Sequence, residues 1–129
     1  MIIRVLKMIS LRKSSVKRVV DYINNPQNCK ERLDYLRISN CNTDDDIEKA
    51  VRRMMLTQSM NVKAKSDLIM HLVMSFHERP DDKTLGEIED YVMEKLGYQD
   101  HQRITRGHND TDHFHLHVIV NRVNPKDFK

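Results

Sequence analysis

Hydrophobic and polar residues alternate, or form short apolar runs, in several segments of the chain. Such segments, when turn residues bound them, are typical of strands, and they predict strands at about residues 2–7, 33–39, 67–76, 102–108 and 114–123. Other segments repeat apolar residues every three or four positions, which predicts amphipathic helices at about residues 15–24, 44–55 and 82–96. The elements therefore follow the order β-α-β-α-β-α-β-β and end in a hairpin.

Residues that favour helix starts support these helices. Ser14 or Ser15 can cap the first helix, and Thr43, followed by three aspartates, provides a start for the second helix. Pro80 precedes the third helix, which we expect Gly97 to close. We expect the apolar face of the third helix to comprise Leu85, Ile88, Val92 and Leu96.

This order of elements predicts an α+β fold, in which helices pack on a mostly antiparallel central sheet. The chain has 129 residues, which is about the length of one typical domain. The sequence contains no repeat and no linker long enough to separate two domains. We therefore expect a single domain over residues 1–129.

Composition and charge limit the class of protein and of partner. Hydrophobic residues make up 39% of the chain, enough for one core, and no apolar run approaches a membrane span. We therefore expect a cytoplasmic protein with no membrane insertion, whose two cysteines, Cys29 and Cys41, are free thiols. The net charge is +3, but residues 1–33 alone carry +6. A basic end suits a polyanion such as nucleic acid, although a solvated basic surface would give the same pattern.

Four of the seven histidines fall within residues 107–121. Successive side chains of a strand point to opposite faces, so the last predicted strand has an apolar face and a histidine-rich face. The apolar face comprises Phe114, Leu116, Val118 and Val120. The opposite face comprises His113, His115, His117 and Asn121.

Metal binding accounts for this row of imidazoles better than chance clustering on a solvated face. His115 and His117 are two positions apart and can reach the same ion, while His108 can approach from the neighbouring strand. Asp110 and Asp112 lie in the connecting turn, where a carboxylate can orient an imidazole. Three neutral imidazoles favour Mn, Zn, Co or Ni over Mg²⁺. A metal with three protein ligands keeps positions open for a substrate oxygen.

These residues resemble motifs of the plasmid mobilisation and conjugation relaxases, which belong to the HUH endonuclease superfamily. Residues 108–123 resemble the third motif of that family, at the positions His108-x-Asp110-Thr111-Asp112-x-x-His115-Leu116-His117-Val118-x-x-Asn121-Arg122-Val123. Asp21-Tyr22-Ile23 resembles the nucleophile motif of the MobA/NikB-like (MOBP) branch, and residues 71–76 resemble its middle strand. The resemblance covers residues 14–125.

The resemblance implies an HUH relaxase-like fold and a site- and strand-specific DNA nicking and rejoining reaction. In this family a tyrosine hydroxyl attacks one phosphodiester of single-stranded DNA and forms a 5′-phosphotyrosine link. Tyr22 would then be the nucleophile, and His108, His115 and His117 would bind a divalent ion, Mn²⁺ or Mg²⁺ with Zn²⁺ as an alternative. Asp110 would orient a ligand or help to remove the tyrosine proton.

The same resemblance implies the partners of the protein. Single-stranded DNA at a transfer origin would be the substrate, and accessory mobilisation proteins and type IV secretion coupling machinery would be protein partners. Relaxase domains normally continue well beyond the third motif, so we expect this domain to be truncated at its C-terminal end.

The basic N-terminal segment provides candidates for DNA binding. The residues that we expect to contact DNA phosphates are Arg12, Lys13, Lys17 and Arg18.

Two alternatives stay open at the level of sequence. Residues 113–119 also fit the alternating histidine pattern of histidine-triad nucleotide hydrolases, which act through a histidine without a metal, although the Gly-Gln turn expected upstream is missing. A relaxase remnant that binds DNA or metal without cutting is the second alternative. Nicking of a labelled single strand with and without EDTA would distinguish all three.

Overall fold

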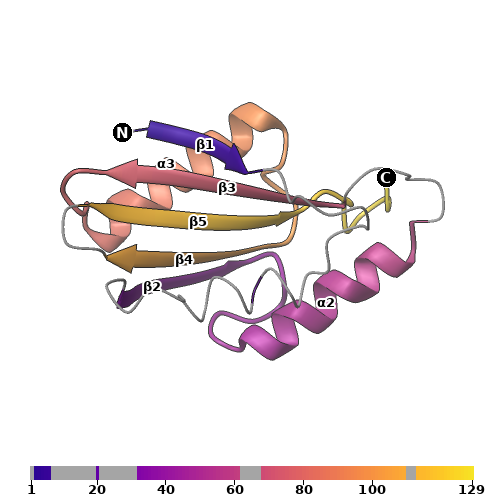
Figure 1. Cartoon of the computed structure of the whole chain (residues 1–129). Coiled ribbons are helices and arrows are strands. Elements are labelled where there is room, and N and C mark those ends of the chain that lie inside the picture. Colours follow the sequence, from indigo (N-terminus) through magenta and orange to yellow (C-terminus); the bar gives the residue numbers. More distant parts are fainter. Residues whose placement is uncertain (1, 7–19, 21–31, 62–67, 110–112) are drawn as a thin grey trace.

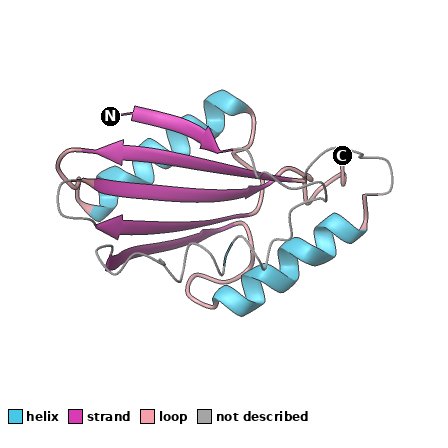
Figure 2. Cartoon of the chain, in the orientation of Figure 1, coloured by secondary structure: helices cyan, strands magenta, loops and turns pink. Residues whose placement is uncertain are grey.

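The computed structural model describes residues 2–6, 20, 32–61, 68–109 and 113–129. The strands among them are β1 (Ile2–Leu6), β2 (Arg32–Ser39), β3 (Ile69–Phe76), β4 (Arg103–Asn109) and β5 (Phe114–Asn121). The helices are α2 (Ile47–Ser59) and α3 (Asp82–Leu96) (Figures 1 and 2). The predicted first helix lies outside the described residues, apart from the helical and buried Val20.

The five strands form one sheet in the order β1-β3-β5-β4-β2. Every neighbouring pair is antiparallel, so the predicted α+β class with an antiparallel central sheet is confirmed. β5 lies at the centre of the sheet, between β3 and β4, and the first two strands form the edges. The histidine-rich β5 therefore has a hydrogen-bonded neighbour on each side.

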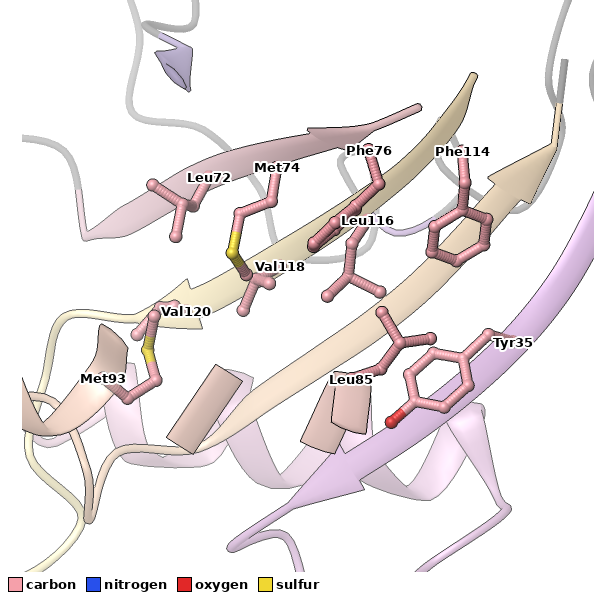
Figure 3. Close-up of a cluster of buried hydrophobic side chains, with 10 residues drawn as sticks. All are labelled: Tyr35, Leu72, Met74, Phe76, Leu85, Met93, Phe114, Leu116, Val118 and Val120. Carbon is pink, nitrogen blue, oxygen red and sulfur yellow. The ribbon is translucent and has the colours of Figure 1, made fainter. Parts of the chain in front are cut away.

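One face of the sheet packs against α3, which lies behind the sheet in Figure 1. The predicted apolar face of β5 is confirmed, because all four of its apolar side chains belong to this core. Leu85 and Met93 of α3 pack against them (Figure 3). The sheet contributes Tyr35, Leu72, Met74, Phe76, Phe114, Leu116, Val118 and Val120.

On the opposite face of the sheet, the described residues form a second apolar core at one end. Ala50, Val51 and Met54 of α2 pack against one end of this face, with Val20 and the free thiol of Cys41. The sheet residues in this second core are Ile38, Ile69, Ile104 and Ile119. Ile119 is two positions from His117 on the same strand, so the second core borders the histidine-rich part of the same face.

Capping residues set the ends of α3 as the sequence predicts, but the apolar face differs by one residue. Asp81 caps the N-terminus by accepting a hydrogen bond from the Thr84 N–H (2.7 Å), and Gly97 ends the helix with φ of +82°. Leu96, predicted to face the core, is 48% exposed, whereas Met93 is fully buried. The fully buried residues of α3 are Leu85, Glu89 and Met93, which are spaced four positions apart, and Leu96 does not continue that stripe.

The second helix begins later than the sequence predicts. Asp46 is the N-cap of α2, because its carboxylate accepts a hydrogen bond from the Lys49 N–H (3.1 Å). The hydroxyl of Thr43 instead accepts a hydrogen bond from the Asp46 N–H (3.2 Å) and stabilises the turn before the helix. Both residues can cap a helix, and the sequence does not distinguish between them.

A buried ion network anchors α3 to the sheet. Glu89 of α3 is fully buried and accepts hydrogen bonds from Arg103 of β4 (2.5 Å) and Arg37 of β2 (3.1 Å). The carboxylate of Asp90 accepts from the same two guanidinium groups, at 2.8 Å from Arg103 and 2.9 Å from Arg37. The network lies at the end of β4 opposite to His108, so we treat it as structural.

Candidate functional site

The hairpin of β4 and β5 brings the three predicted metal ligands to one face of the sheet. His108 lies directly opposite His115 across the strand pair, and Arg106 lies opposite His117. Residues that face each other across antiparallel strands point to the same side. The face is the one opposite α3, as the alternation along β5 predicts.

β3 adds two side chains to the same face from the other side of β5. His71 is 2% exposed, and a hydrogen bond of 2.9 Å joins its Nε2 to Nδ1 of His117. Ser75 lies opposite His115, and its hydroxyl is 2.9 Å from Nδ1 of that ring. His71 and Ser75 therefore share this face with the predicted metal ligands.

The rings of the cluster are close together. The ring centroids of His108 and His117 are 4.5 Å apart, and those of His71 and His117 are 5.1 Å apart. His117 therefore lies between a histidine of β4 and a histidine of β3. His113 and the exposed His77 lie farther toward the end of the sheet, with ring centroids 5.0 Å apart.

Burial keeps the central imidazoles uncharged near neutral pH. The pKa of His117 is lowered to about 3, first because burial removes water from the charged form and then because His108, His71 and His115 would repel it. Burial likewise lowers the pKa of His71 to about 4, with a smaller contribution from His108. The neutral imidazole is the form that binds a metal ion.

The donor chemistry of this cluster fits a divalent transition metal. Hydrogen bonds at Nδ1 of His115 and His117 fix the orientation of both rings, which is typical of metal-binding histidines. Within the described part of the chain, however, no three His, Cys, Asp or Glu side chains already converge on a metal position.

Several predicted site residues fall outside the described residues. These are the predicted nucleophile Tyr22, the predicted catalytic carboxylate Asp110, and the basic residues Arg12, Lys13, Lys17 and Arg18. The structure therefore describes only those predicted site residues that lie on the sheet.

Arg106 also lies on the histidine face, although the sequence analysis did not include it in the site. Strand alternation could have identified it, because Arg106 precedes His108 by two positions and therefore shares its face.

Comparison with known proteins identifies the family. Residues 22–129 match the family model "Relaxase: MobA/VirD2-like, nuclease domain". This chain belongs to that relaxase family. The resemblance drawn from the sequence motifs is confirmed, and a relaxase-type endonuclease domain replaces the histidine-triad hydrolase as the interpretation of the histidine pattern. Relaxases bind single-stranded DNA at the origin of transfer and generally depend on a divalent metal.

Curated relatives agree with the family match. Two proteins named TraI from Escherichia coli are 36% and 38% identical over 127 residues, 97% of this chain. A protein named MobA from Acidithiobacillus ferrooxidans is 38% identical over 77 residues, which is 58% of this chain and 19% of that protein. The chain spans only 17% of the length of either TraI protein.

No solved structure matches the chain. Among the described residues, no helix has the length and hydrophobicity needed to cross a lipid bilayer.

Proposed function

We propose that this relaxase domain nicks and rejoins one strand of DNA at a plasmid transfer origin through a 5′-phosphotyrosine intermediate. The observation that carries the proposal is the cluster of His108, His115 and His117 on one face of the central β4–β5 hairpin. Family membership supports the reaction class, and the buried, uncharged state of His117 supports metal binding at that face.

The chemistry of the step can be stated for the residues of this chain. The hydroxyl oxygen of Tyr22 attacks the phosphorus of the scissile phosphodiester, and the bond from phosphorus to the 3′ oxygen breaks. Asp110 orients a histidine ligand or accepts the phenol proton, because a phenol with a pKa of about 10 is a weak nucleophile at neutral pH. The reverse step, attack by the 3′ hydroxyl on the phosphotyrosine, rejoins the strand without an external energy source.

The three histidines would hold the divalent ion, Mn²⁺ or Mg²⁺ with Zn²⁺ as an alternative. When bound, the ion would polarise a phosphate oxygen and offset the charge that develops during attack. The hydrogen bonds of His71 and Ser75 occupy Nδ1 of His117 and His115, so Nε2 is the atom of each ring that would bind the ion. Because that coordination depends on neutral imidazoles, binding should weaken in acid.

Four basic residues of the N-terminal segment, Arg12, Lys13, Lys17 and Arg18, would contact DNA phosphates on the approach to the site. Accessory mobilisation proteins and the coupling machinery of a type IV secretion system would be further partners, and the reaction would take place in the cytoplasm.

The covalent adduct tests this function. The chain is incubated with Mn²⁺ and a single strand from the transfer origin of its own genetic element, and the products are separated under denaturing conditions. We expect an adduct that EDTA prevents and that Tyr22→Phe abolishes, because that substitution removes only the nucleophilic oxygen. Tyr91→Phe, the same change at a tyrosine that is 61% exposed, is the matched control and should form the adduct.

Two results would contradict the function in different ways. An adduct that persists in Tyr22→Phe and maps to another tyrosine would overturn the assignment of the nucleophile. Binding of the strand without any adduct in the unchanged chain would instead support the non-catalytic remnant that the sequence leaves open.

A further inference from the structure

Arg106 lies in the row of residues that faces the same side as the histidines. On β4 it lies between Ile104 and His108 along one face, and across the sheet it lies opposite His117 of β5 and Leu36 of β2. The side chain is half-buried, and its Nε atom is shielded from solvent. Arg106 is thus paired directly with His117, the histidine that lies between His108 and His71.

Arg106 differs from the other three arginines whose side chains the structure describes as buried or half-buried, because no carboxylate pairs with it there. Arg37 and Arg103 bind Glu89 and Asp90. Arg79 binds the carboxylates of Asp34 and Asp82. By contrast, the buried Nε of Arg106 has no hydrogen-bond acceptor.

The charge of Arg106 is therefore uncompensated in the described part of the chain. A buried N–H donor without an acceptor destabilises the fold, because neither water nor protein replaces the hydrogen bond that it makes in solvent. An arginine kept in this state beside a substrate site is suited to an anion that arrives with the substrate.

We propose that the guanidinium of Arg106 binds a backbone phosphate of single-stranded DNA beside His117, and so contributes a phosphate subsite to the histidine face. The proposal rests on the proposed DNA substrate of this site but not on the covalent step or on the metal. A guanidinium has five N–H donors in a planar fork that matches two phosphate oxygens, so it can satisfy the buried Nε–H and a second N–H together.

Equilibrium binding of a fluorescent single-stranded oligonucleotide, measured in EDTA at several salt concentrations, tests this subsite. We expect Arg106→Gln to weaken binding about tenfold or more, because a charge-assisted hydrogen bond is lost. The slope of log affinity against log salt concentration should become shallower by about 0.7, the value for one phosphate of a single strand. Arg53→Gln, at an exposed arginine of α2, is the matched control and should change neither quantity.

A second variant separates charge from geometry. Arg106→Lys keeps the charge but not the planar fork, so it should retain the salt dependence and recover only part of the affinity. Thermal unfolding should show that Arg106→Gln is at least as stable as the unchanged chain, since the substitution removes an uncompensated half-buried charge.

The outcomes distinguish this subsite from the proposed reaction. Unchanged affinity and salt slope in Arg106→Gln would overturn the subsite even if the Tyr22 adduct forms. Weakened binding in Arg106→Gln, together with no adduct in the unchanged chain, would support the subsite and contradict the catalytic function. Failure of the unchanged chain to bind single-stranded DNA would overturn both.

Discussion

The buried imidazoles of His71 and His117 should make the metal-free fold sensitive to mild acid. Both rings have pKa values lowered in the folded state, to about 4 for His71 and about 3 for His117. In the unfolded chain, a histidine has a pKa of about 6.5. Between pH 7 and pH 5 the unfolded chain therefore takes up protons that the folded chain does not, and stability falls as the pH is lowered.

The expected loss follows from the separation of the pKa values. At pH 5, each histidine that is protonated only in the unfolded state destabilises the fold by about 2 kcal/mol, so the pair contributes about 4 kcal/mol. A small domain is stable by about 5–15 kcal/mol in total, so the effect is large. Asp81 and Asp90 have pKa values lowered from 3.8, so their contribution to stability is lost only at more acidic pH and not between pH 7 and pH 5.

Urea unfolding at pH 7 and pH 5, in EDTA, measures this loss directly. In His71→Gln, which keeps an amide donor near Nδ1 of His117, one titrating group is gone, and the loss should fall to about 2 kcal/mol. His77→Gln, at an exposed histidine, is the matched control and should keep the full loss. A loss below about 1 kcal/mol in the unchanged chain, or an equal loss in His71→Gln, would refute the assignment of acid sensitivity to this pair.

Two further predictions concern the scaffold that holds the site. Glu89→Gln should lower the free energy of unfolding by about 3–5 kcal/mol, since it leaves the buried Arg103 without its closest carboxylate; a change below about 1 kcal/mol would show that Asp90 alone suffices. Gly107→Ala should cost about 1–3 kcal/mol in the same urea assay, because an added Cβ would lie 2.6 Å from the Phe114 ring and 2.7 Å from Cβ of Tyr35. Unchanged stability in that variant would mean that β4 can move away from the ring.

The sequence predicts the elements of this fold well because its strands alternate and its helix ends carry capping residues. The face of β5 follows from alternation alone, and Asp81 and Gly97 mark the ends of α3 at the predicted places. The non-sequential strand order could not be read from the pattern, since alternation is local and does not say which strands become neighbours. Leu96 was assigned to the core because positions three or four apart both fit a helical stripe, and the fully buried stripe follows Glu89 and Met93 instead.

Some features of the candidate site depend on neighbouring residues of the sequence, and others depend on the pairing of distant strands. The grouping of His108, His115 and His117 is local to one hairpin, so the sequence could predict it. The hydrogen bond between His71 and His117 joins residues 46 positions apart and needs the pairing of β3 with β5. Arg106 was missed because a lone arginine in a strand is unremarkable until its lack of a carboxylate partner is known.

The position of the site on the sheet explains how these groups can act together. On the face opposite α3, Ile104 and Ile119 lie against α2. Two positions farther along the same strands, and on the same face, are Arg106 and His117. The apolar cluster thus borders the histidines and excludes water from one side of them. That exclusion keeps His117 uncharged, and it would strengthen the attraction of Arg106 for the proposed phosphate. The same burial that is expected to make the fold acid-sensitive would therefore favour the metal ion and the phosphate that we propose at adjacent positions of this face.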